Sequence, residues 1–85
     1  MGTELVVEAV GPARVSTREF ASLLRSFEHA LSAEPPERVV LADESDEALA
    51  AALVASKLLI PLAARADATR AASPNAAVIA QLASA

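Results

Sequence analysis

The chain has 85 residues, a formal net charge of −4 and no cysteine. Its length leaves room for one domain and excludes two. The lack of cysteine excludes disulfides and thiolate metal sites, and it fits a reducing, cytoplasmic location. The acidic balance, with a pI near 4.8, argues against sequence-independent binding to nucleic acid, which needs clustered lysine and arginine.

The apolar content is high, but much of it consists of small side chains. Hydrophobic residues make up 54% of the chain, yet aromatic residues make up only 2%, and 22 residues are alanine. Burial of an alanine methyl removes far less apolar surface from water than burial of leucine or phenylalanine. A core of this kind in so short a chain has a thin stability margin, so we expect a homo-oligomer or a protein partner.

A membrane location is not expected. The stretch closest to a transmembrane helix runs over residues 48–64, and Lys57 and Pro61 interrupt it. A spanning helix needs about 20 predominantly apolar residues.

Two elements are predicted in the first half of the chain. Residues 4–10 are short and β-branched, and Gly11-Pro12 follows them, which is typical of a strand. Ser16 to Glu19 form a capping box, which predicts the start of a helix. Its apolar stripe then recurs at helical spacing at Phe20, Leu23, Leu24, Phe27 and Leu31. Pro35 and Pro36 end this helix.

The second half repeats the alternation. Residues 38–43 predict a strand, 46–58 a helix whose first turn is acidic, and 58–63 a loop leading into a third strand. Residues 64–72 read as a loop. Ser73 and Pro74 then predict the N-cap and first position of a last short helix, with Val78, Ile79 and Leu82 on its apolar face.

The order β-α-β-α-β-α predicts an α/β fold with a three-stranded parallel sheet, in a small three-layer or two-layer unit that forms half a Rossmann-like domain. The strand at 38–43 is apolar on both faces, as in a parallel sheet covered by helices. The sheet of such a half-domain is expected to leave exposed edges.

The acidic loop 43–47 follows the second strand, where α/β folds bind ligands, so Asp43 and Glu44 are candidate ligand-binding residues. The loop holds four carboxylates, and such oxygens suit Mg²⁺. They equally suit capping of the next helix, which is the interpretation we favour. We therefore predict no metal and no other cofactor.

Arg65 and Arg70 follow the third strand and are candidates for binding a phosphate or carboxylate. The chain has no glycine-rich phosphate loop and no nucleophile elbow. His29 lies among Arg18, Ser22 and Arg25 on the polar helix face, which predicts an exposed histidine. No catalytic residue is predicted.

Several motifs together resemble a known family. Residues 36–55 are similar to a Lys-Pro-Asp strand, a His-Gly-Asp-Thr-Thr loop and an alanine-rich helix, and residues 60–62 are similar to an Ile-Pro-Val strand start. Residues 15–31 and 73–83 are similar to the flanking helices. Residues 4–85 thus resemble part of the N-terminal Rossmann-like domain of the UDP-N-acetylglucosamine 2-epimerase family, which has the GT-B architecture.

The resemblance implies sugar-nucleotide binding but not catalysis. The His-Gly-Asp triplet falls on residues 42–44 and keeps only an acid, and the Glu-Ala-Gly-Leu-Arg motif falls on residues 66–70 and keeps Arg70. Of the Asn-Arg pair, Asn75 is kept and Ala76 replaces the arginine. A UDP-sugar is the implied ligand, with Asn75 joining the candidate ligand-binding residues named above.

Two functions are compatible with these observations. The favoured one is a non-catalytic α/β interaction module that self-associates or docks on a larger partner. The alternative is a sugar-nucleotide-binding or epimerase-type enzyme subunit that another chain completes.

Overall fold

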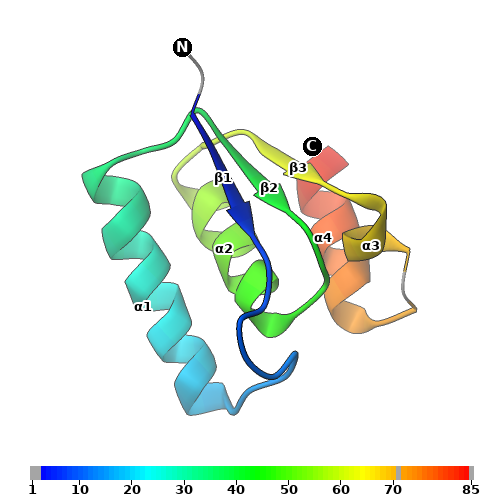
Figure 1. The fold of residues 1–85 in the computed structure, drawn as a ribbon. Helices are drawn as coiled ribbons and strands as arrows, with labels where there is room; N and C mark the ends of the chain where they lie inside the picture. Colours follow the sequence, from blue (N-terminus) through cyan, green and yellow to red (C-terminus); the bar gives the residue numbers. More distant parts are fainter. Residues whose placement is uncertain (1–2, 71, 85) are drawn as a thin grey trace.

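The computed structural model describes residues 3–70 and 72–84 and shows an α/β fold (Figure 1). Its strands are β1 (Glu4–Val7), β2 (Arg38–Leu41) and β3 (Leu62–Ala64). Its helices are α1 (Thr17–Ala33), α2 (Asp46–Lys57), α3 (Ala66–Thr69) and α4 (Pro74–Ser84). The strands form one parallel sheet in the order β1-β2-β3, which confirms the predicted three-stranded parallel unit.

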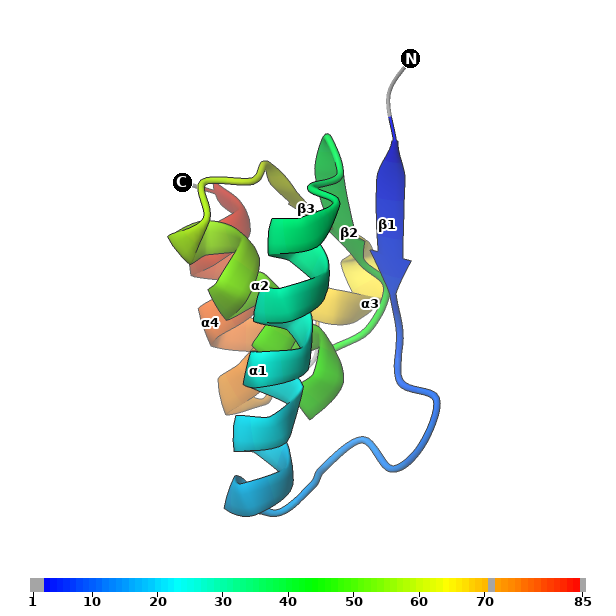
Figure 2. The same cartoon turned by 90° about the vertical axis from the view of Figure 1, so that its left-hand side faces the viewer.

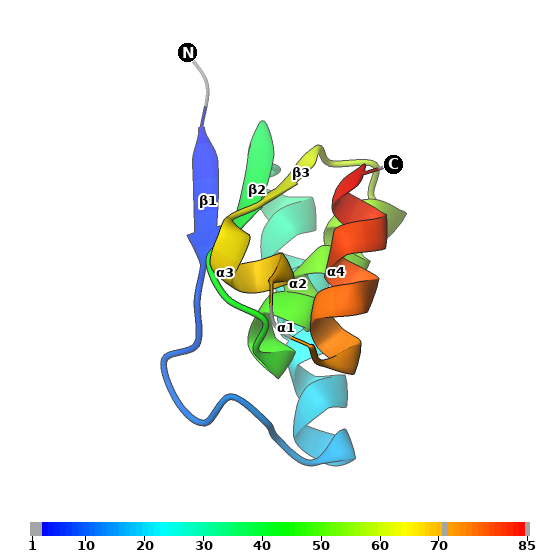
Figure 3. The same cartoon turned by 90° about the vertical axis from the view of Figure 1, so that its right-hand side faces the viewer.

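The helices α1, α2 and α4 lie together on one face of the sheet (Figures 2 and 3). The strands follow one another across the sheet in a single direction, from β1 to β2 to β3. Because both crossovers are right-handed, α1 and α2 therefore lie on the same face of the sheet. The unit therefore has two layers. Of the predicted three-layer and two-layer arrangements, the structure has the two-layer one, because the described residues contain no crossover in the opposite direction.

The other face of the sheet carries one apolar row. Val7, Val39 and Leu41 belong to the core under the helices, so the alternate residues point the opposite way. Register places Val6 beside Val40 and Val40 beside Ala63 across the three strands. An ion pair between Glu4 and Arg38 lies in the neighbouring row. Val6, at the edge, is 43% exposed, whereas Val40, in the central strand, is only 7% exposed.

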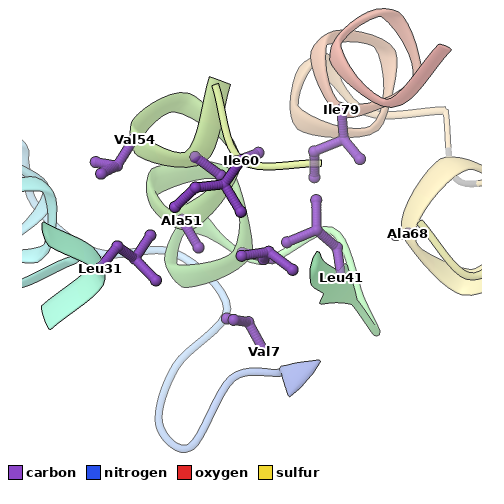
Figure 4. Close-up of a cluster of buried hydrophobic side chains, with 12 residues drawn as sticks. Val7, Leu31, Leu41, Ala51, Val54, Ile60, Ala68 and Ile79 are labelled. Atoms are coloured by element: carbon purple, nitrogen blue, oxygen red, sulfur yellow. The ribbon is translucent and has the colours of Figure 1, made fainter. Parts of the chain in front are cut away.

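The centre of the core is α2. Five alanines and Val54 of this helix are buried, and side chains from β1, β2, α1, α3 and α4 converge around it (Figure 4). Alanine is small enough to let a helix approach a sheet and two neighbouring helices at once. Part of the alanine noted in the sequence is thus used in α2, the helix at the centre of the helical layer.

The helix α1 begins as predicted, because the Ser16 hydroxyl oxygen accepts a hydrogen bond from the Glu19 amide at 3.1 Å. Its apolar stripe is covered less than expected. Leu31 is 2% exposed, whereas the stripe residues Phe20, Leu23, Leu24 and Phe27 are only half-buried. The reason is position: α1 lies at the end of the helical layer and packs against α2.

Three boundaries differ from the sequence-based prediction. The first strand ends at Val7 instead of residue 10, because the Ala9 amide donates to the Asp43 carboxylate instead of to a neighbouring strand. The second ends at Leu41 instead of 43, where the chain turns into the α2 cap. The predicted loop 64–72 contains the short helix α3, and its residue 71 lies outside the described residues.

The last helix begins at Pro74 with Ser73 as its cap, as predicted: the Ser73 hydroxyl oxygen accepts from the Ala76 amide at 3.1 Å. Its apolar face is partly different from the prediction. Ile79 is buried and Leu82 half-buried, but Val78 is exposed.

The C-terminus of α2 has a Schellman geometry with a leucine in the position that usually holds glycine. The Ile60 amide donates to the Ala55 carbonyl at 2.9 Å, and the Leu59 amide donates to the Ser56 carbonyl at 3.2 Å. Leu59 has a φ of 60° and is 89% exposed. A β-carbon in this left-handed region is strained, and the exposed side chain recovers almost no burial energy within the chain.

Replacing Leu59 with glycine is therefore expected to stabilise the isolated subunit by about 0.5–1 kcal/mol, since glycine relieves the strain and loses little burial. Urea unfolding followed by circular dichroism at low protein concentration measures the change. Leu59→Ala is the control, because alanine keeps the β-carbon and should leave the free energy of unfolding nearly unchanged. A destabilised glycine variant would contradict the strain argument.

Candidate functional site

The polar residues that follow the strands gather at the carboxyl edge of the sheet, as expected for parallel strands. Three of the five predicted site residues lie together there. The Asn75 side-chain amide donates to the Glu44 carbonyl at 3.1 Å and to Asp46 Oδ1 at 2.8 Å. Asp43 lies in the same turn before α2. The structure therefore brings Asp43, Glu44 and Asn75 together.

The two aspartates of this edge hold the loop between β1 and α1. Asp43 accepts from the Ala9 amide at 2.9 Å and from the Ser45 amide at 3.0 Å. Asp46 accepts from the Val15 amide at 2.9 Å. Each carboxylate thus fixes backbone that is about thirty residues away in the chain, and its acceptor oxygens face the protein's own amides.

Glu44 joins the same edge to the start of α4. Its carboxylate accepts from the Ser73 hydroxyl at 3.1 Å and pairs with the Arg14 guanidinium. Arg14 also donates to the Glu44 carbonyl at 3.2 Å. We call the set Arg14, Asp43, Glu44, Asp46, Ser73 and Asn75 the carboxyl-edge network.

Sequence reasoning did not select Arg14, Asp46 or Ser73 as site residues. Asp46 and Ser73 carry helix-start signals, which explain their local role but not their contacts with distant loops. Arg14 lies in a loop without periodicity, and nothing in its neighbourhood indicates that it meets Glu44.

Both aspartates have a pKa below the ordinary value. For Asp43, burial would raise the pKa, but hydrogen bonds from the Ser45 hydroxyl and from the Ala9 and Ser45 amides outweigh it and leave the pKa lowered. For Asp46, the hydrogen bond from Asn75 lowers the pKa most, the Val15 amide and the Arg14 charge lower it further, and burial opposes them. In both cases the folded protein favours the charged form.

The protein is therefore expected to lose stability in acid. A carboxyl whose pKa is lowered by folding adds stability above its unfolded pKa, and this stability is lost as the pH falls through the folded pKa. The loss should set in below the ordinary aspartate value of 3.8. Thermal unfolding from pH 7 to pH 2 measures it, and a doubly substituted Asp43→Asn, Asp46→Asn protein should show a shallower dependence. An equally steep dependence in that variant would contradict the assignment.

Metal binding finds no geometric support in this edge. Within residues 3–70 and 72–84, no three His, Cys, Asp or Glu side chains are grouped so that they could hold a metal ion. The interpretation that these carboxylates cap the next helix is wrong: the Ser45 hydroxyl oxygen caps α2 by accepting from the Ala48 amide at 3.1 Å, and the carboxylates of Asp43, Glu44 and Asp46 accept from distant loops instead.

The remaining candidates lie outside the network. Arg65 and Arg70 flank α3 and are exposed, and among the described residues neither guanidinium has a hydrogen bond or an ion pair. His29 is exposed on α1, as predicted from its polar face. The structure thus does not connect the two arginines to Asp43, Glu44 and Asn75.

Three hollows border α1 in the described part of the chain, and the shallow one of about 500 Å³ around His29 and Ser32 is lined by this helix alone. Another, of about 320 Å³, lies where the β1–α1 loop meets α1, and its lining includes Pro12, Leu23 and the acids Glu19 and Glu47 but no base. A phosphate there would meet two carboxylates and no positive charge. The third, of about 350 Å³, lies between α1 and α2, and most of its lining is apolar. We call it the α1/α2 groove.

Comparisons with known proteins assign no family. No protein-family model matches the chain, and neither does any curated protein or solved structure. In the described part of the chain, no helix combines the length and apolar character needed to cross a membrane.

Proposed function

We propose that this protein is a non-catalytic α/β interaction module that self-associates or docks on a larger partner. The observation that carries the proposal is the parallel sheet with helices on one face only (Figures 2 and 3). Parallel sheets in proteins are nearly always covered on both faces, because their strands are apolar on both. A sheet that has helices on one face leaves its second face for another layer to cover.

The uncovered apolar surface supports an interaction role. Val6, Val40 and Ala63 form a row on this bare face, in which Val6 is 43% exposed, Ala63 is half-buried and Val40 is buried, and β1 and β3 form the two edges of the described sheet. Edge strands present unpaired amides and carbonyls that other chains can reach. Further apolar side chains are exposed beyond the sheet, above all Val10 and Leu59.

The contacts of the carboxyl-edge network indicate that the predicted site residues stabilise the fold. Its aspartates accept backbone amides and its glutamate pairs with Arg14, so these groups fasten loops. A general acid or base needs a proton-exchanging group beside a substrate position. The groups here already have partners within the chain.

The proposal is tested by light scattering on a size-exclusion column, with circular dichroism on the same peak. A folded dimer or larger species at micromolar concentration is expected. Val6→Glu places a charge on the bare face and tests whether a partner is held through that face, and Ala77→Glu places the same charge at an exposed position of α4 as a control. A folded monomer that captures no partner in a pull-down would overturn the proposal.

The alternative function is a sugar-nucleotide-binding subunit, and the feature that favours it is that the guanidiniums of Arg65 and Arg70 have no partner among the described residues. The lack of a base around the hollow at the β1–α1 loop weighs against it. Thermal unfolding with millimolar UDP-sugar separates the two. We expect no shift, and a shift that Arg65→Ala and Arg70→Ala abolish would favour the alternative.

A further inference from the structure

We propose that the α1/α2 groove binds a second copy of this chain, in a two-fold arrangement that lays α1 of each subunit on α2 of the other. The proposal rests on the proposed function and deepens it by naming the partner and the surface. It uses the helical side of the molecule, opposite the bare face of the sheet.

The groove is apolar at its base and charged at its rim. Leu24 of α1 and Leu53, Val54 and Leu58 of α2 and its cap line the base. The rim residues are Arg25 and Glu28 on α1 and Lys57 on α2. Its volume of about 350 Å³ is at the low end of the range for small-molecule sites, and it lies along two helices that run side by side. Such a surface suits the side chains of a packed helix.

One pair of rim charges, Glu28 and Lys57, is self-complementary. In a two-fold interface each contact occurs twice, so residue i meets residue j and residue j meets residue i. A two-fold axis along the groove places each α1 over the partner's α2. Glu28 then faces the partner's Lys57, because both residues line the same stretch of the groove. The remaining rim charge, Arg25, leaves each side with an excess of one positive charge.

The exposed area agrees with a dimer. The accessible surface is 5271 Å², whereas about 4,700 Å² is typical of a monomer of this mass. The excess of roughly 500 Å² over the typical monomer is an excess for the whole chain, and a stable interface takes about 800 Å² from each partner.

Leu59 is an independent observation at the end of the same groove. It follows Leu58, which lines the groove, and it is 89% exposed in a left-handed conformation that glycine would adopt without strain. Within one chain this leucine costs stability and buries almost nothing. A second copy that binds in the groove would give the Leu59 side chain an apolar surface to pack against.

The first test is a charge exchange, read by sedimentation velocity over a concentration series. Glu28→Lys is expected to weaken the dimer at least about tenfold, because it leaves only positive charges at the rim. The double variant Glu28→Lys, Lys57→Glu restores the pairing and should return the dissociation constant to within about threefold of the original. Glu8→Lys, on the β1–α1 loop, is the matched control and should leave the dimer unchanged. Failure of the double variant to restore dimerisation would overturn the arrangement.

The second test uses Leu59→Gly, which should have opposite effects on folding and association. The variant is expected to unfold at a higher urea concentration when monomeric, yet to dimerise about three- to tenfold more weakly. A purely structural role for Leu59 would leave association unchanged, and that result would remove it from the interface.

The failure of this inference is distinguishable from failure of the proposed function. A dimer that survives Glu28→Lys but dissociates with Val6→Glu overturns the groove assignment and leaves the proposed function standing. A folded monomer at every concentration also overturns the groove assignment. The proposed function then depends on a different protein as the partner.

Discussion

Replacing Leu31 with alanine is expected to lower the free energy of unfolding by about 2–5 kcal/mol, the largest effect of any change considered for this chain. Leu31 is the α1 residue that is fully buried, and it joins α1 to the core around α2 (Figure 4). Its truncation leaves a cavity at the point where α1 is anchored. In a domain with a stability of about 5–15 kcal/mol or less, the loss takes the variant close to unfolding at 25 °C.

Urea unfolding followed by circular dichroism measures this loss, with Leu23→Ala as the matched control. Leu23 belongs to the same apolar stripe on the same helix but is half-buried, so its truncation should cost about 1 kcal/mol. Equal losses for the two variants would show that the stripe is uniformly covered. That outcome would fit an α1 that is covered by a second copy during the measurement, so both variants are compared at low concentration.

Replacing Asp46 with alanine is expected to cost about 2–3 kcal/mol, the second largest effect. The change removes the acceptor of the Val15 amide and of the Asn75 side chain at once. It also removes a negative charge from the first turn of α2, where such a charge stabilises the helix. The β1–α1 loop and the start of α4 lose a shared point of attachment.

Two further variants separate these contributions. Glu47→Ala removes an acid from the same helical turn without removing a hydrogen bond that fastens a loop, so it should cost less than about 1 kcal/mol. Asp46→Asn keeps one acceptor oxygen and should fall between the two. Hydrogen exchange adds a local readout, because the Val15 amide should lose protection in Asp46→Ala. Unchanged protection at Val15 would contradict the assigned contact.

The stability role of Asp46 also bears on the candidate site. A ligand that took the carboxyl-edge oxygens would have to displace amides of the β1–α1 loop and the side chain of Asn75. That competition costs the ligand the free energy that these contacts contribute to folding. The network is therefore better suited to holding loops than to exchanging ligands.

The helix starts were predictable because their causes are local. Ser16 caps α1 through an amide three residues away, and Ser73 caps α4 in the same way. The α2 bounds also agree closely with the acidic first turn and the apolar run that follows it. Signals of this kind need only the neighbouring residues, so a single sequence carries them.

The strand ends and the site were not predictable in the same way. Residues 8–10 continue the apolar, β-branched pattern of β1, but the Ala9 amide finds its acceptor in Asp43. Asp43 and Glu44 were selected because they follow a strand, yet whether they face a ligand or the chain's own amides depends on where residues 9–15 run. Local patterns hold no information on that path.

The sequence by itself determined the order of strands and helices, the parallel sheet and the helix caps, since periodicity and capping act over a few residues. Only the tertiary structure decided that all helices of this layer lie on one face, that Leu31 alone of the α1 stripe is fully buried, and that the acidic loop is used to fasten other loops. An apolar strand has the same sequence pattern whether one or both of its faces are covered. The difference depends on crossover direction and on contacts between residues about thirty positions apart.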